Sequence, residues 1–158
     1  MKTLNLLILC IAITSLTLSC SSDDDSQPVT PDNSFTLSDF VGSWIATSAL
    51  HINNSNASEN FDMIANGAII RFTMLAGGGT RTWIDFGTYQ DEWDAQASLS
   101  GNVITMTPVE TSREEAVFVV EKEGNIITLT NSNDSFDFTL SGATPVSSTS
   151  VSTFIPNN

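Results

Sequence analysis

The sequence predicts an all-β protein: an eight-stranded antiparallel up-and-down β-barrel with a short N-terminal helical turn. Apolar residues recur at every second position in short segments, which is the period of a half-buried strand. Turn-forming Gly and Asn residues separate these segments, and only residues 36–41 have a helical pattern. Closing such a meander removes both of its exposed hydrogen-bonding edges, so a barrel is favoured over an open sheet.

Each predicted strand contributes one inward row of alternating residues. The rows cover residues 44–52, 70–74, 82–86, 93–99, 104–106, 118–120, 127–129 and 136–140. Turn signals lie at residues 77–79, 100–102, 123–125 and 131–134. In the first strand, alternation places Trp44, Ser48 and Leu50 inward and His51 outward.

Two connections are expected to close the ends of the barrel. A single helical turn at residues 36–41, capped by Thr36 or Ser38, would plug one end. The long polar connection at residues 53–67 would form a lid at the other, open end. Its apolar residues Phe61 and Met63 either fold over a cavity mouth or pin the connection to the barrel, and the sequence leaves both readings open.

The first 19 residues have the three parts of an export signal: Lys2, an apolar run to about residue 18, and a small residue before Cys20. The run is shorter than the roughly 20 apolar residues of a membrane-spanning helix. The stretch from Leu16 to Cys20, Leu-Thr-Leu-Ser-Cys, resembles the cleavage box of a bacterial lipoprotein precursor. That resemblance implies removal of residues 1–19 and attachment of acyl chains such as palmitate to Cys20.

The resemblance extends past the cysteine and sets the expected domains and location. Residues 23–25 are all Asp and resemble the tag of Bacteroidetes-type lipoproteins displayed on the outer face of the outer membrane. We expect a flexible acidic linker at 20–34, a barrel at 35–142 and a Ser/Thr-rich tail at 143–158. Trp83 faces outward by parity, either exposed to a protein or glycan or covered by this tail.

The barrel segment itself resembles a lipocalin-like domain. The match rests on Leu37-Ser38-Asp39-Phe40-Val41-Gly42-Ser43-Trp44, a helical turn followed by Gly-x-Trp, and on the Gly-Asn turns and alternating strands at 100–106 and 123–129. It spans about residues 35–141. The resemblance implies a closed barrel with Trp44 packed across one end. The family's Thr-Asp-Tyr motif and disulfide are absent, so the resemblance implies no particular ligand.

Charge and residue types exclude several function classes. With 18 acidic and 5 basic residues the chain has a net charge of −13, which disfavours nucleic acid and anionic lipid headgroups as partners. Membrane attachment is therefore expected from the lipid on Cys20. His51 is the sole histidine, and the acids around residues 91–94 and 131–134 fit solvated turns. We therefore expect no catalytic residues, no metal site and no cofactor.

The remaining hypothesis is non-catalytic binding of a small apolar ligand inside the barrel. The alternative is a filled barrel that serves as a surface module for protein or glycan contacts. The oligomeric state is open, with a monomer as the simplest expectation. The predicted ligand-binding residues, from the barrel interior and the lid, are Trp44, Ser48, Leu50, Phe61, Met63, Phe72, Phe86, Trp93, Phe118 and Phe138.

Overall fold

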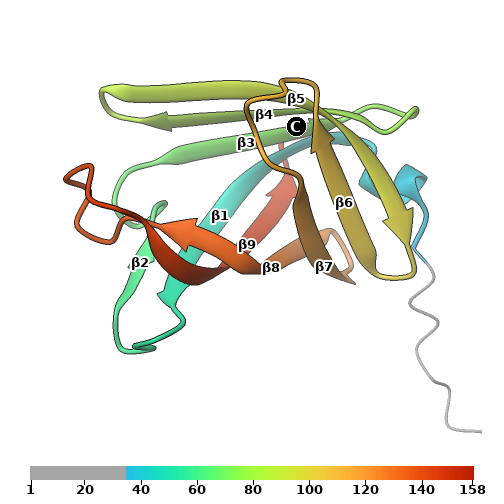
Figure 1. Cartoon of the computed structure of the whole chain (residues 1–158). Helices are drawn as coiled ribbons and strands as arrows, with labels where there is room; N and C mark the ends of the chain where they lie inside the picture. The colour runs from blue at the N-terminus through green and yellow to red at the C-terminus, as the bar shows by residue number, and fades with distance from the viewer. Residues whose placement is uncertain (1–34) are drawn as a thin grey trace, which may run out of the picture. The chain divides into compact units, whose positions relative to one another are not determined.

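The computed structural model describes residues 35–158, which form one antiparallel sheet that closes on itself (Figure 1). The predicted signal peptide at 1–19, the lipidation site Cys20 and the linker at 20–34 lie outside the described residues. The elements are the 3-10 turn η1 (Leu37–Phe40) and the strands β1 (Gly42–Asn53), β2 (Asn60–Asp62), β3 (Ile69–Met74), β4 (Gly79–Phe86), β5 (Tyr89–Ser100), β6 (Val103–Pro108), β7 (Ala116–Glu123), β8 (Ile126–Phe136) and β9 (Val146–Pro156). Within this range, no helix has the length and apolar character needed to cross a membrane.

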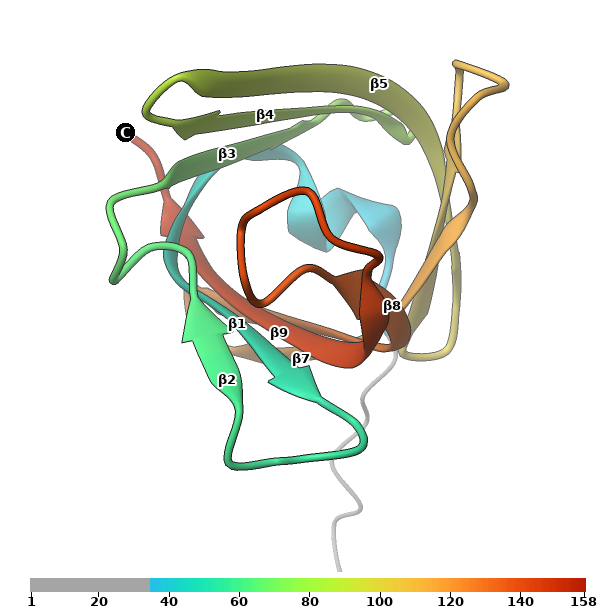
Figure 2. The same cartoon turned by 60° about the vertical axis from the view of Figure 1, so that its left-hand side comes forward.

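From β3 to β9 consecutive strands are neighbours in the sheet, and β1 pairs with β3 on one edge and with β9 on the other, which closes the ring. Eight strands form the barrel, while the short β2 adds to the end of β1 beyond β3. The predicted eight-stranded antiparallel barrel is confirmed. Figure 2 shows the strands arranged in a ring, with η1 behind the ring and the β8–β9 connection in front of it.

The last strand differs from the prediction. Residues 143–158 do not form a tail, because β9 pairs along its length with both β1 and β8. The predicted strand at 136–140 is also wrong: β8 continues through the expected turn at 131–134 and ends at Phe136. The inner face of β9 carries Ser148 and Ser150, both buried. A half-buried strand usually turns apolar residues inward, so the segment did not look like a barrel strand. Its partners also place β9 away from β4, so it does not cover Trp83.

A β-bulge in β1 changes which residues face inward. The register with β9 shifts between Ala46 and Ser48, and Thr47 is the extra, exposed residue. Inward positions before the bulge are Trp44 and Ala46; after it they are Ala49 and His51. The prediction that Ser48 and Leu50 face inward and His51 outward is therefore wrong, because strict alternation fails across a bulge.

The 3-10 turn closes one end of the barrel, as predicted. Phe40 is 1% exposed, and its carbonyl accepts a hydrogen bond of 2.8 Å from Nε1 of Trp44. The Asp39 carboxylate accepts hydrogen bonds from the backbone and the hydroxyl of Thr36, which lower the pKa of Asp39. Lys122 donates a hydrogen bond of 3.1 Å to the Asp39 carbonyl and ties the turn to β7.

A tight turn at the same end depends on a glycine. Gly78 has φ of +81°, and a Cβ there would lie 2.7 Å from the Ala97 carbonyl oxygen. The chain passes close to β5 at this point, since Ala97 N–H donates to the Gly78 carbonyl at 2.7 Å. Both the left-handed backbone and the close approach require glycine.

Phe154 and Ile155 test whether the C-terminal segment is a barrel strand. Phe154 is 6% exposed and packs near Phe72, whereas Ile155 is 38% exposed on the outer face. We expect Phe154→Ala to lower the free energy of unfolding by about 3 kcal/mol, because it leaves a cavity in the core. Ile155→Thr should change it by no more than about 0.5 kcal/mol. Urea unfolding followed by circular dichroism measures both; equal effects would contradict this arrangement of β9.

Candidate functional site

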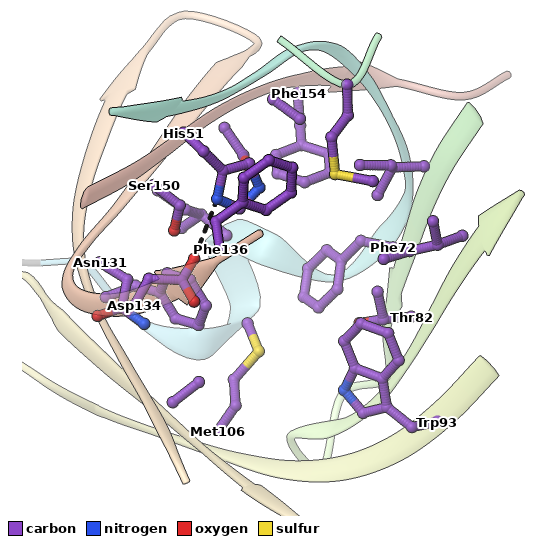
Figure 3. Close-up of a pocket in the computed structure, with 18 of the residues that line it drawn as sticks. His51, Phe72, Thr82, Trp93, Met106, Asn131, Asp134, Phe136, Ser150 and Phe154 are labelled. Carbon is purple, nitrogen blue, oxygen red and sulfur yellow. Dashed lines mark ion pairs between the residues drawn. The ribbon is translucent and has the colours of Figure 1, made fainter. Parts of the chain in front are cut away.

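A cavity of about 430 Å³ lies inside the barrel (Figure 3). Strands β1 and β3–β9 and the β2–β3 connection all contribute to its lining. It exists because several inward side chains are small: Ala49 on β1, Ala116 on β7, and Ser150 and Ser152 on β9. Large side chains at these positions would fill the barrel with its own core.

One side of the cavity is an apolar wall, built by strands β3 to β7. Alternation along each of these strands points one or two large side chains inward, as the sequence predicted. The apolar wall consists of Ile70, Phe72, Ile84, Trp93, Met106 and Phe118. Figure 3 shows Phe72 and Trp93 on the opposite side of the cavity from Asn131 and Asp134.

The other side is a polar wall, which we define as His51, Asn131, Asp134 and Ser150. These residues come from the three adjacent strands β1, β8 and β9. Ser150 stands opposite His51 on one side and Asn131 on the other, so the three form one cross-strand row. The cavity is therefore amphipathic: its carboxylate, imidazole and amide groups lie on this side, and the opposite side is mainly apolar, with Thr82 and Tyr89 as its polar residues.

A second β-bulge supplies two members of the polar wall. The register of β8 with β9 shifts between Asn131, opposite Ser150, and Asp134, opposite Ser148. The extra residue turns both Asn131 and Asp134 toward the cavity, although they are three positions apart. The Asn131 side-chain oxygen accepts a hydrogen bond of 2.9 Å from the backbone N–H of Asn133, which supports this local geometry.

His51 lies between an aromatic ring and a carboxylate. Its ring stacks on Phe136 with centroids 4.1 Å apart, and its Nδ1 lies 3.4 Å from Oδ2 of Asp134. The His51 side chain is 14% exposed, and within residues 35–158 its Nδ1 has no hydrogen-bond partner. Burial lowers the pKa of His51, while the carboxylates of Asp134 and Asp62 act in the opposite direction. The imidazole is thus neutral at neutral pH.

Aromatic residues surround Phe136 where β8 ends. Phe61 stacks on Phe136 at a centroid distance of 5.5 Å, and Phe138 meets Phe136 edge-on at 5.0 Å. Phe86 packs edge-on against Phe61 at 6.4 Å. We call Phe61, Phe86, Phe136 and Phe138 the aromatic rim. It joins the predicted lid, β4 and the β8–β9 connection through side-chain contacts.

The connection between β1 and β3 is pinned to the barrel and also contributes to the cavity. The Asp62 carboxylate accepts hydrogen bonds from the Ser48 hydroxyl at 2.8 Å and from the Ala49 and Ile64 backbone N–H groups. Burial raises the pKa of Asp62, but these hydrogen bonds outweigh burial and lower it. Met63, held by its N–H to the Ala49 carbonyl, lines the cavity.

The structure brings together some of the predicted ligand-binding residues. Met63, Phe72, Trp93 and Phe118 line the cavity. Trp44 belongs to the core beside η1, and Ser48 and Leu50 stand opposite the outward residues Thr153 and Val151. Phe61, Phe86 and Phe138 lie in the aromatic rim.

The polar wall is what sequence reasoning missed. His51 was placed outside by strict alternation, residues 131–134 were expected to form a turn, and Ser150 belonged to the expected tail. Each of these residues lies on the cavity side of its strand, either because a bulge interrupts the alternation, as in β1 and β8, or because the inner face of the strand is polar, as in β9. The β-branched residues Thr149, Val151 and Thr153 at alternate positions were the available sign of a strand.

Among residues 35–158, no group of three or more His, Cys, Asp or Glu side chains is placed to hold a metal ion.

Comparison with protein-family models, curated proteins and solved structures finds no match for this chain. The candidate site therefore rests on the geometry of the cavity.

The lowered pKa of His51 predicts a pH dependence of stability. An unfolded histidine titrates near pH 6.5, whereas folded His51 resists protonation, so the unfolded state binds more protons as the pH falls through 6.5. We expect the free energy of unfolding to fall between pH 8 and pH 5.5, and to fall less in His51→Gln. Urea unfolding at the two pH values measures the change. An identical pH dependence in the variant would contradict a buried, neutral His51.

Proposed function

We propose that this protein is a lipid-anchored, lipocalin-like protein of the cell envelope whose barrel binds a small, mainly apolar ligand without catalysis. The cavity of about 430 Å³ carries this proposal. Its volume falls within the range of about 300 to 1,000 Å³ typical of small-molecule sites. An eight-stranded barrel either is filled by its own side chains or holds one small ligand, and the small inward residues favour the second case.

The apolar wall would supply most of the affinity. Burial of apolar ligand surface contributes roughly 25 cal/mol per Å². The aromatic rim and Met63 join the β1–β3 connection to the barrel around Phe136. In this proposal they keep water from the bound ligand, and the β8–β9 connection in front of the lumen controls its entry (Figure 2).

The proposed attachment rests on the N-terminal sequence. An apolar run ending in Leu-Thr-Leu-Ser-Cys supports acylation of Cys20, and the Asp run at 23–25 supports display on the outer membrane surface. The barrel begins after the proposed linker at 20–34.

The proposal of a non-catalytic role rests on the surroundings of the sole histidine. His51 contacts a carboxylate and a phenyl ring, and its Nδ1 makes no hydrogen bond to a hydroxyl in the described part of the chain. Serine hydroxyls need such a base to act as nucleophiles. Binding requires only the cavity.

The alternative, a surface module for proteins or glycans, draws support from Trp83 on the outer face of β4. Its ring is half-buried, and the Arg71 guanidinium lies 5.0 Å from the ring centroid. Stacked Arg71 therefore occupies a ring face that a sugar would need. The internal cavity favours ligand capture over this alternative.

Filling the cavity tests the proposal. Ser150 points into the cavity from β9, and its neighbour Val151 lies on the outer face. We expect Ser150→Leu to weaken binding of an uncharged naphthalene-type fluorescent probe at least about tenfold, because the leucine occupies ligand space. Val151→Leu should leave binding within about twofold of the unchanged protein.

The measurement is probe titration of the purified full-length protein, with circular dichroism to verify folding. Native mass spectrometry of protein purified from its own cell envelope adds a search for a bound small molecule. Failure of the unchanged protein to bind the probe, together with the absence of any co-purifying molecule, would overturn the carrier proposal.

A further inference from the structure

We infer that the cavity distinguishes amphiphilic ligands by their polar ends: it accepts a protonated amine, accepts a hydroxyl less well, and rejects a carboxylate on the same apolar body. This inference rests on the proposed function, since it concerns the ligand of the same cavity. It comes from the distribution of charge around the cavity, in which one carboxylate faces the apolar wall with no cation beside it.

Among residues 35–158, Asp134 is the only acidic residue that lines the cavity, and no Lys or Arg of this range lines it. The Asp134 side chain is 29% exposed. Its Oδ1 accepts a hydrogen bond of 2.7 Å from the Ser135 backbone N–H, and its Oδ2 lies 3.4 Å from Nδ1 of His51 (Figure 3). A carboxylate accepts several hydrogen bonds, so Oδ2 retains capacity for a donor on the ligand.

His51 does not offset the charge of Asp134. A protonated imidazole would form an internal ion pair and would also attract an anionic ligand. Burial against Phe136 disfavours that form, so the polar wall holds no cation beside the Asp134 carboxylate. The other members of the polar wall, Asn131 and Ser150, are uncharged and offer both donor and acceptor atoms to a hydroxyl.

The cations of the described chain are engaged elsewhere. Arg81 pairs with Asp94 and Glu92 on the outer face, and Lys122 lies beside Asp39 at η1. Arg71 stacks on Trp83.

Arg113 contacts a residue of the apolar wall: its guanidinium carbon lies 4.8 Å from the ring centroid of Trp93. Its guanidinium is held by Asp91 and Glu110, and these hydrogen bonds raise the pKa of Arg113. A carboxylate ligand in the cavity would therefore be buried near Asp134 without a cationic partner, which is strongly unfavourable.

The positions of the two walls also orient the ligand. The polar wall lies on β1, β8 and β9, and the apolar wall lies across the lumen on β3 to β7. An amphiphile satisfies both when its polar end meets Asp134 and its apolar body packs against Phe72, Met106 and Phe118. A ligand without a polar end would leave the Asp134 carboxylate facing hydrocarbon.

Decylamine, decanol and decanoate test this inference because they share one apolar body. Each is titrated at pH 7, below its micelle concentration, as a competitor of the uncharged probe on the purified full-length protein. We expect decylamine to bind at least about tenfold more tightly than decanoate, with decanol between them, as charged hydrogen bonds are the stronger ones. Asp134→Asn should weaken decylamine at least about fivefold and leave decanol within about twofold.

Glu121→Gln is the matched control, because it removes one carboxylate from an exposed position on β7. Glu121→Gln should change none of the three affinities more than about twofold. If the overall charge of −13 attracted decylamine instead, Asp134→Asn and Glu121→Gln would weaken its binding by the same small factor. Equal binding of decanoate and decylamine by the unchanged protein would overturn the inference and leave apolar capture standing. Failure of all three ligands and of the probe would overturn the proposed function as well.

Discussion

The barrel depends on the hydrogen-bond ladders that β9 makes along both of its edges. One ladder joins β9 to β1 from Trp44 to Asn53, and the other joins it to β8 from Ile127 to Phe136. Without them β1 and β8 would present unpaired backbone groups to water, and the lumen would open along its length. The inner face of β9 is mostly serine, so the strand that closes the barrel also leaves the space inside it. Closure and cavity thus have one structural origin.

The chemistry of the cavity depends on two β-bulges. In β1 the extra residue turns His51 inward, and in β8 it turns Asn131 and Asp134 inward. An unbulged β1 would alternate uniformly and bury Leu50 in place of His51. Both bulges lie next to β9, so His51, Asn131 and Asp134 lie together on one side of the lumen, while the face of β3 to β7 is mainly apolar. The result is an amphipathic cavity with one uncompensated carboxylate.

Much of the fold was predictable because most strands follow simple rules. Ile70 and Phe72 on β3, or Ile104 and Met106 on β6, alternate with polar residues and are buried as that pattern requires. The helical turn with Phe40 and Trp44 was also visible. The site was predictable only where the wall is apolar. Ser150 carried no signal of burial, and a bulge has no marker in local sequence, since it is set by pairing with a distant strand.

The sequence by itself determined the period of the strands and the positions of the glycine turns, because each depends on residues close together in the chain. Only the tertiary structure decided which strand closes the barrel and which residues line its interior. The physical reason is that register, bulges and closure are properties of strand pairs. His51 and Ser150 lie far apart in sequence, and they become neighbours only when β1 and β9 share hydrogen bonds.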